Sequence, residues 1–132
     1  MTPYSTDFSQ PALATGLPET LAALADAAGR IGVADTDVAR LTLVVEELFV
    51  NTITHGQCND GSTTIEVGLG RSPAGIHLRY SDAAAPFDLA AASRPTAEES
   101  SVGGLGITLI HGLCRALTAR HADGRNIYEM LI

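Results

Sequence analysis

Two runs of alternating apolar and polar residues, 63–71 and 75–82, are joined by the short sequence SPAG. Alternation on both sides of a turn that contains Pro and Gly predicts a β-hairpin. A second hairpin is predicted where residues 114–121 and 125–132 flank an Asp-Gly dipeptide. Two hairpins commit much of the chain to antiparallel strands, so the remaining segments are expected to cover one face of a sheet.

Helical spacing of apolar residues predicts helices over residues 17–30, 35–55 and 107–113. A short edge strand is predicted around Phe8, and residues 83–102, which are rich in Ala, Ser and Pro, are predicted to form a loop with one short helical piece. This order of elements indicates an α+β fold built as a two-layer sandwich. We expect a mixed, mostly antiparallel sheet that is covered by helices on one face.

Length and composition indicate one globular domain that spans residues 1–132. The chain has 45% hydrophobic and 17% charged residues, and its formal net charge is −7. All eight basic residues are Arg, which is a poor balance for binding a nucleic-acid backbone, so no direct nucleic-acid partner is expected. A nucleotide remains compatible with this charge, because helix N-termini, backbone amides and a metal ion can hold phosphates.

The location expected for this chain is the cytoplasm. The N-terminus lacks a basic segment followed by an apolar run, and no stretch approaches the roughly 18 consecutive apolar residues of a membrane helix. No membrane association is therefore expected. Cys58 and Cys114 have no metal-ligand spacing, and in an acidic chain without an export signal they are expected to be reduced thiols.

The segment VVEELFVNTITHG places Glu47, Asn51 and His55 four residues apart in a predicted helix that is otherwise mostly apolar. At about 100° per residue these side chains form one line on the side opposite the main apolar face. On spacing alone, a solvated polar stripe is the simpler interpretation. The residues that flank the line are nevertheless apolar: Leu43, Val44 and Val50. A polar line set into an apolar helix is better explained by a functional site.

These three side chains suit the chemistry of a metal-bound phosphate. An Asn side-chain oxygen is a hard ligand for Mg²⁺, which keeps most of its waters and takes few protein ligands. A Glu one turn away can accept a proton from a hydroxyl or a water that attacks phosphorus. The role of His55 stays open between satisfying a carbonyl at the helix end and bracing the following loop.

Two further segments contain candidate nucleotide contacts. Asp82 ends a predicted strand, where its carboxylate can accept a hydrogen bond from an exocyclic amine such as that of adenine. A turn-initiating Asp is the simpler alternative. Gly103, Gly104 and Gly106 precede an apolar helix, and glycines at a helix start let backbone amides approach an anion. Gly-rich turns before helices are common, so this motif is weak by itself.

Taken in order, the three segments resemble the ATP-binding domain of the GHKL superfamily, which has the Bergerat fold. Within it, the chain is most similar to the small anti-sigma-factor serine kinases of bacteria. The resemblance covers about residues 8–132. The first family motif, Glu-x-x-x-Asn-x-x-x-His-Gly, is matched throughout by residues 47–56. The second keeps Asp82 and Phe87, and the glycine motif is matched by residues 103–107.

The resemblance implies a role for each matched residue. Glu47 would be the general base, Asn51 the Mg²⁺ ligand and Asp82 the residue that binds adenine. The sequence GRN at 124–126 is similar to the family's turn before the last strand, which implies that Asn126 supports the adenine end through a water. The other residues implied at the nucleotide are His55, Ala84, Phe87, Arg94, Gly103, Gly104, Leu105, Gly106 and Ile107, with backbone amides of residues 104–107 directed at the phosphates.

The chain departs from the family pattern at two places. Ala84 stands where a glycine is expected two residues after Asp82, which implies a tighter or shifted adenine pocket. The lid, residues 88–102, has Arg94 as its only cation, whereas related kinases commonly place a basic residue near the terminal phosphate. The scarcity of cations in the lid bears more on phosphoryl transfer than on nucleotide binding.

The function that the resemblance implies is a protein serine/threonine kinase that uses ATP and Mg²⁺. It would phosphorylate a small protein antagonist of the anti-anti-sigma type, with a sigma factor as a further partner and a homodimer as the assembly. The alternative is a switch module in which nucleotide sets the affinity for a regulatory partner without transfer. Two other readings are the catalytic piece of a histidine kinase, whose phosphoacceptor would come from another chain, and a domain with no nucleotide, which requires three coincident motifs.

Overall fold

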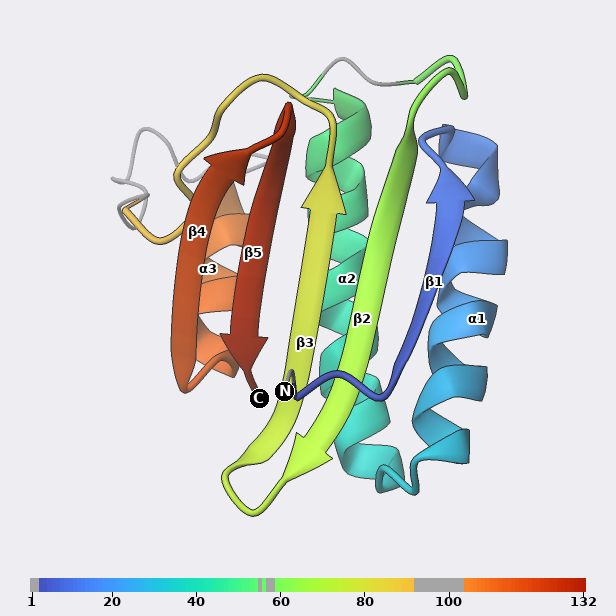
Figure 1. Ribbon diagram of the computed structural model, residues 1–132, viewed down its shortest axis with the longest axis vertical. Coiled ribbons are helices and arrows are strands. Elements are labelled where there is room, and N and C mark those ends of the chain that lie inside the picture. Colours follow the sequence, from blue (N-terminus) through green and yellow to red (C-terminus); the bar gives the residue numbers. More distant parts are fainter. Residues whose placement is uncertain (1–2, 55, 57–58, 92–103) are drawn as a thin grey trace.

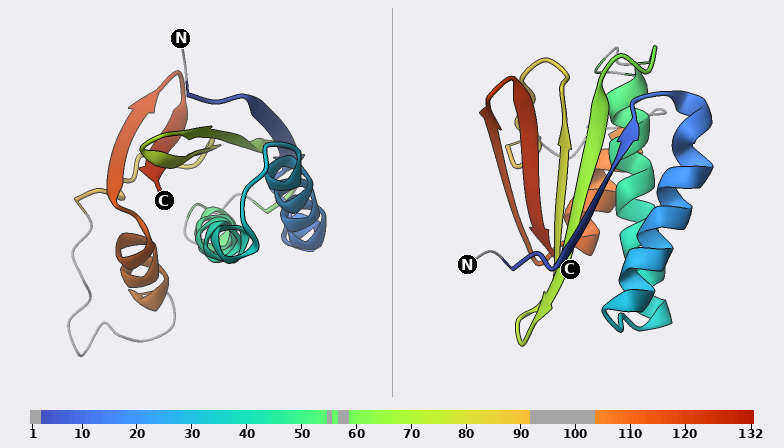
Figure 2. Two further views of the ribbon diagram at one scale, coloured as in Figure 1. Left: turned by 90° about the horizontal axis from the view of Figure 1, so that it is seen from below. Right: turned by 45° about the vertical axis from the view of Figure 1, so that its right-hand side comes forward.

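The chain forms a sheet with helices packed on one of its faces (Figures 1 and 2). The computed structural model describes residues 3–54, 56, 59–91 and 104–132. The strands are β1 Thr6–Pro11, β2 Thr64–Ser72, β3 Gly75–Asp82, β4 Ala116–Ala122 and β5 Arg125–Leu131, in the sheet order β1-β2-β3-β5-β4. The helices are α1 Leu17–Arg30, α2 Asp35–Thr54 and α3 Gly104–Leu113, with a 3₁₀ turn, η1 Ala14–Gly16, before α1.

The predicted α+β two-layer sandwich is confirmed, with the predicted order of elements. The sheet is antiparallel at every pairing between the described strands, so it contains none of the parallel pairing that a mixed sheet would have. Helix α3 begins at Gly104, earlier than predicted, so Gly104 and Gly106 belong to its first turn and not to a preceding loop. In the described part of the chain, no helix is long and apolar enough to cross a membrane.

Both predicted hairpins form. In β2–β3, Ser72 pairs with Gly75 across Pro73 and Ala74. In β4–β5, the turn residues Asp123 and Gly124 have φ angles of 54° and 76°. Positive φ at both positions is typical of a type I′ turn, which an Asp-Gly sequence favours. The second hairpin places β5 beside β3 in the sheet. Asn126, near the start of β5, therefore lies next to Asp82 at the end of β3.

Helix α2 is the central helix of its layer and lies between α1 and α3 (Figure 2). Its buried residues are Leu41, Val44, Val45, Leu48, Phe49 and Thr52. Burial of each large apolar side chain contributes about 2 kcal/mol to stability. Of the apolar residues that flank the polar line, Leu43 and Val50 are exposed, whereas Val44 is fully buried. The reason is that α2 packs against helices on two sides as well as against the sheet.

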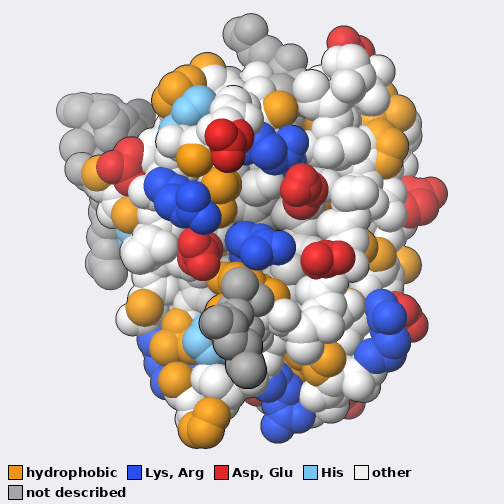
Figure 3. All heavy atoms as spheres, in the orientation of Figure 1, with side chains coloured by type: hydrophobic (Ala, Val, Ile, Leu, Met, Phe, Trp, Pro, Cys, Tyr) orange, Lys and Arg blue, Asp and Glu red, His pale blue; other side chains and the backbone are white. Residues whose placement is uncertain are grey.

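The face of the sheet that the helices leave uncovered carries charged side chains of both signs (Figure 3). The hydroxyl of Tyr4 donates to Oε2 of Glu129 at 2.9 Å, and the guanidinium of Arg79 lies 4.6 Å from the Tyr4 ring centroid. Burial, followed by the hydrogen bond to Glu129, raises the pKa of Tyr4 above its usual range. Arg120 lies 3.6 Å from Glu129. These contacts tie the segment before β1 to strands β3 and β5.

Cys114 is expected to react slowly with alkylating reagents. It follows α3 and packs partly against the core, and burial raises the pKa of its thiol from 9.0 to about 11. Because the thiolate is the nucleophile, this rise lowers the reactive fraction about 100-fold near pH 8. Iodoacetamide labelling of a Cys58→Ser variant, followed by mass spectrometry in buffer and in urea, measures the difference. Equal labelling rates in the folded and unfolded states would contradict it.

Candidate functional site

Four elements that carry predicted site residues converge toward one end of the sheet (Figure 1). Strand β3 ends at Asp82, and β5 begins next to Asn126. These two residues are partners in the β3–β5 register. The last two turns of α2 carry Glu47 and Asn51, and α3 begins at Gly104. The antiparallel topology therefore assembles one site from segments that are far apart in the sequence.

Asp82 is 4% exposed and has hydrogen-bond donors on both of its carboxylate oxygens. Oδ1 accepts from the side-chain amide of Asn126 at 3.0 Å and from the backbone N–H of Ala84 at 3.2 Å. Oδ2 accepts from Oγ1 of Thr52 at 2.8 Å. The hydrogen bond from the Ala84 N–H is the local contact expected if Asp82 only initiates a turn. The other two come from β5 and α2, so Asp82 does more than initiate a turn.

Asn126 is 1% exposed, and its side-chain amide organises the loop after β3. Its Nδ2 donates to the carbonyl oxygens of Ala85 at 2.9 Å and Ala84 at 3.3 Å, in addition to Asp82. Its Oδ1 accepts from the backbone N–H of Phe87 at 2.9 Å. A single buried side chain thus fixes both the carboxylate and the loop that follows it, while the Phe87 side chain remains 41% exposed.

Ala84 closes this loop against the end of α2. A Cβ placed on Gly56 would lie 2.7 Å from the Ala84 methyl, which leaves no room for a side chain at position 56. Ala84 itself is buried. The Ala84 methyl group fills space that a glycine would leave open. The tighter adenine pocket expected from the sequence would therefore arise at the contact between Ala84 and Gly56.

Thr52 is a site residue that sequence reasoning missed. Its side chain is 1% exposed, and Oγ1 lies 2.7 Å from the hydroxyl of Tyr80 and 3.0 Å from the carbonyl oxygen of Leu48, in addition to its bond to Asp82. The sequence offered only a weak signal, because a helical Thr commonly bonds the carbonyl four residues before it. Thr52 lies on the buried side of α2, and only the packing of α2 against the sheet shows that it contacts Asp82.

Two tyrosines lie beneath this network. The rings of Tyr80 and Tyr128 are stacked, with centroids 6.4 Å apart and planes at 10°. Burial first, and then the charges of Asp82 and Asp88, raise the pKa of Tyr128 above its usual range. Tyr128 therefore remains a neutral phenol beside the carboxylates at any physiological pH.

Glu47 lies against the first turn of α3. A Cβ built on Gly106 would collide with Oε2 of Glu47 and would lie 3.2 Å from its Cδ. The carboxylate therefore touches the α3 backbone, and only a glycine permits this approach without moving Glu47. The first N–H groups of a helix have no intrahelical partners and favour negative charge, so the same turn is suited to an anion such as phosphate. One helix, α2, thus contacts both Asp82 and the start of α3.

Asn51 is half-buried one turn beyond Glu47. Among the residues that the structure describes, no group of three or more His, Cys, Asp and Glu side chains is placed to hold a metal ion. The Asn51 side chain, without such a group beside it, does not fit a structural zinc site, which takes four protein ligands. It fits Mg²⁺, which would be held mainly by phosphate and water, with the Asn51 amide oxygen as its protein ligand.

Three of the predicted residues, His55, Arg94 and Gly103, lie outside the described residues. Gly104 and Leu105 are described only as part of the α3 backbone. Ile107 is half-buried and packs against the core, so its side chain has a structural contact as well as a predicted backbone role.

The arginines of the described ranges have partners elsewhere. These partners are Asp26 for Arg30, Asp37 for Arg40, the Gly32 carbonyl for Arg71, Tyr4 for Arg79, the Ile132 carbonyl for Arg115, Glu129 for Arg120, and Ser81 with Glu66 for Arg125. Arg125 adjoins Asn126 in sequence but bonds to the opposite face of the sheet, because side chains alternate along a strand. Among the described residues, an anion at this site would therefore be held by the N–H groups at the start of α3 and not by an arginine.

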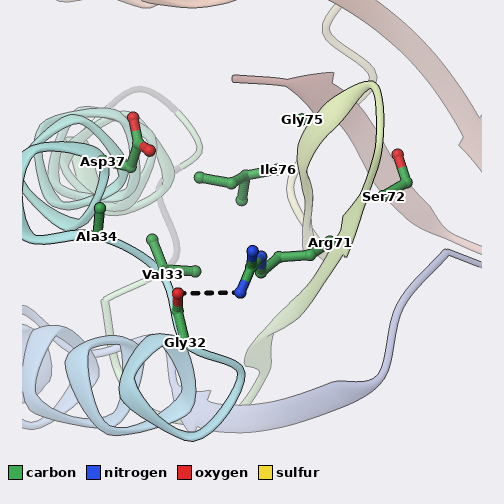
Figure 4. Close-up of a pocket in the computed structure, with 8 residues that line it drawn as sticks. All are labelled: Gly32, Val33, Ala34, Asp37, Arg71, Ser72, Gly75 and Ile76. Atoms are coloured by element: carbon green, nitrogen blue, oxygen red, sulfur yellow. Dashed lines mark hydrogen bonds between the residues drawn. The ribbon is translucent and has the colours of Figure 1, made fainter.

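A pocket of about 230 Å³ lies at the other end of the sheet, between the α1–α2 turn and the β2–β3 turn (Figure 4). Arg71 points across it and donates to the carbonyl oxygens of Ile31 at 2.8 Å and Gly32 at 2.9 Å. Gly32 has a φ of 76°, the left-handed conformation common after a helix end. The guanidinium is thus engaged in capping α1, and the pocket is remote from the residues of the predicted site.

Comparison with known proteins agrees with this architecture. The family model for the histidine kinase-like ATPase domain matches residues 10–132, while no curated protein matches significantly. The RsbU and RsbW domains of Rv1364c from Mycobacterium tuberculosis match with a TM-score of 0.61 and 15% identity, over 96% of this chain but only 32% of that chain.

The structure of the SiaB–SiaC complex from Pseudomonas aeruginosa matches with a TM-score of 0.55 and 16% identity, over 97% of this chain and 89% of that chain. At these identities the two structures support the fold, and the family model carries the assignment. With the convergence of Glu47, Asp82 and the start of α3 on one site, the chain belongs to the histidine kinase-like ATPase domain family.

Proposed function

We propose that this protein is an ATP- and Mg²⁺-dependent serine/threonine-protein kinase of the anti-sigma-factor type. The observation that carries the proposal is the double contact of α2. Through Thr52 this helix bonds the carboxylate of Asp82, and through Glu47 it touches the first turn of α3 at Gly106. One rigid helix can therefore align a base-binding end with a phosphate-binding end.

In this proposal each group has a distinct task. Asp82 accepts a hydrogen bond from the adenine amine, and the amides at the start of α3 hold the phosphates. Asn51 supplies an oxygen to Mg²⁺, which neutralises phosphate charge when bound. Glu47 accepts the proton of the attacking hydroxyl. Phosphoryl transfer depends mainly on positioning and charge stabilisation, which these groups supply.

The proposed acceptor is a serine or threonine of a small protein antagonist, in the cytoplasm. The motifs that resemble anti-sigma-factor kinases support this class of partner. The structural likeness to a chain of the SiaB–SiaC complex also supports a protein partner. A sigma factor as a second partner and a homodimer follow from the same resemblance.

A second candidate is a nucleotide-dependent switch that binds a regulatory protein without phosphoryl transfer. Two observations favour it. The described arginines are all engaged away from the start of α3, and Ala84 packs on Gly56 where the family commonly has a glycine. The lack of a described arginine at the start of α3 would weaken transfer more than it weakens binding.

Calorimetric titration with ATP, with and without Mg²⁺, is expected to show micromolar-range binding that Asp82→Asn weakens about 10- to 100-fold. Asparagine would keep one oxygen for the donors Asn126 and Ala84, but its NH2 group would face the Thr52 hydroxyl and could not accept a hydrogen bond from the adenine amine. Asp123→Asn is the matched control, because Asp123 is exposed in a turn and Asn tolerates its φ of 54°. Absence of ATP binding to the folded wild type, with or without Mg²⁺, would refute the proposal.

A further inference from the structure

Exposed apolar side chains are concentrated on the elements of the candidate site. In the described part of the chain, four large apolar side chains are substantially exposed: Leu13, Leu43, Val50 and Phe87. Leu43 and Val50 belong to α2, and Phe87 belongs to the loop that follows Asp82. A single exposed apolar residue is ordinary, whereas several of them around one site are typical of a surface that binds another molecule.

Leu43 and Val50 lie before and after Glu47 on the side of α2 that faces away from the sheet, and their side chains are 43% and 42% exposed (Figure 2). At about 100° per residue, these two side chains point within about 20° of each other, and Glu47 points about 40° from Leu43. Along the helix axis Leu43 lies about 6 Å before Glu47, and Val50 lies about 4.5 Å after it. Helix α2 therefore presents a carboxylate between two apolar side chains.

Glu47 lies between these apolar side chains and α3. Its carboxylate contacts Gly106 in the first turn of α3. Asn51, the proposed Mg²⁺ ligand, points about 40° from Glu47 around the helix, in the direction away from Leu43 and Val50. The metal-bound phosphate is therefore expected on the α3 side of Glu47. The opposite side, where Leu43 and Val50 lie, is left for the molecule that provides the attacking hydroxyl.

We propose that Leu43 and Val50 form a docking strip for the protein substrate, which selects an acceptor serine or threonine with apolar residues on both sides of it. The inference rests on the proposed function, in that Glu47 is taken as the general base. The acceptor hydroxyl must then come within about 3 Å of the Glu47 carboxylate, so the residues around the acceptor lie against the docking strip. In an extended segment, side chains two residues apart point to the same side and are about 6.6 Å apart. This spacing is close to that of Leu43 and Val50 from Glu47, so the apolar residues are expected two positions before and two positions after the acceptor.

The test measures phosphate transfer from radiolabelled ATP, with Mg²⁺, to two synthetic peptides that have a central serine. One peptide carries leucine two positions before and two positions after the serine, and the other carries glutamine at both positions. The wild-type protein is expected to label the leucine peptide with a kcat/KM at least about tenfold higher, which is the scale of partly burying an apolar side chain. Equal labelling of the two peptides would overturn the proposal.

A double variant, Leu43→Gln with Val50→Thr, removes the apolar surface of the docking strip while nearly keeping the size of both side chains. Because both positions are exposed, the variant is expected to fold, to bind ATP and to form ADP without peptide as the wild type does. Its preference for the leucine peptide is expected to fall to less than about twofold. Leu13→Gln is the matched control, because Leu13 is 37% exposed but precedes α1, and it should keep the preference. A preference that survives in the double variant would overturn the proposal.

The outcomes separate this inference from the proposed function. A wild type that binds ATP and converts it with water, but labels neither peptide, would overturn the docking strip and leave the nucleotide site in place. A wild type that binds no ATP would overturn the proposed function, and the inference with it. A preference for the leucine peptide that is lost in the double variant and kept in Leu13→Gln supports both.

Discussion

Glu47→Gln is expected to slow conversion of ATP to ADP by about 10²- to 10⁴-fold, the usual contribution of a general base. Gln has nearly the shape of Glu, so it can fill the same space against Gly106, but it cannot take up the proton of the attacking hydroxyl or water. ATP binding is expected to stay close to that of the wild type. Single-turnover ADP formation measures the first quantity, with water or a protein as acceptor, and calorimetry measures the second.

Glu46→Gln is the matched control for this variant. Glu46 is the neighbouring carboxylate on α2, and it points about 100° away from Glu47 around the helix. Removing its charge changes the net charge of the protein by the same amount without touching the α3 start. Equal rates for Glu47→Gln and the wild type would exclude Glu47 as the base and would leave the nucleotide switch as the better reading.

Gly106→Ala is expected to reduce ATP conversion about 100-fold while the protein stays folded. The new methyl group collides with the Glu47 carboxylate and forces it away from the first turn of α3. Glu47 is a flexible side chain, so the helix can remain in place while the carboxylate moves. A misplacement of about 1 Å in a reacting group is enough to cost that factor. The same single-turnover assay, together with thermal unfolding, measures both effects.

Gly112→Ala provides the control within the same helix. A Cβ at Gly112 meets nothing within 4 Å, and Ala is favoured over Gly in a helix by about 1 kcal/mol. Gly112→Ala should therefore keep the wild-type rate and the wild-type or a slightly higher melting temperature. If Gly106→Ala behaves in the same way as Gly112→Ala, the contact between Glu47 and α3 has no part in the reaction.

Much of the fold could be predicted because its signals are local. The Asp-Gly turn of the second hairpin and the alternation of β2 and β3 depend on residues that are close in sequence. The start of α3 was predicted too late in the sequence, because Gly104 and Gly106 are poor helix formers. Tertiary packing nevertheless holds both residues in the helix. The full burial of Val44 beside the polar line could not be predicted, because it depends on the elements that surround α2.

By itself, the sequence determined the order of elements and the α+β class, and its motifs led to the resemblance to an ATP-binding family. Only the tertiary structure decided which atoms meet: Thr52 with Asp82, and Glu47 with Gly106. The physical reason is that periodicity reports the side of a helix or strand on which a residue lies, whereas its neighbour is set by packing between elements. The site of this protein is made of such neighbours.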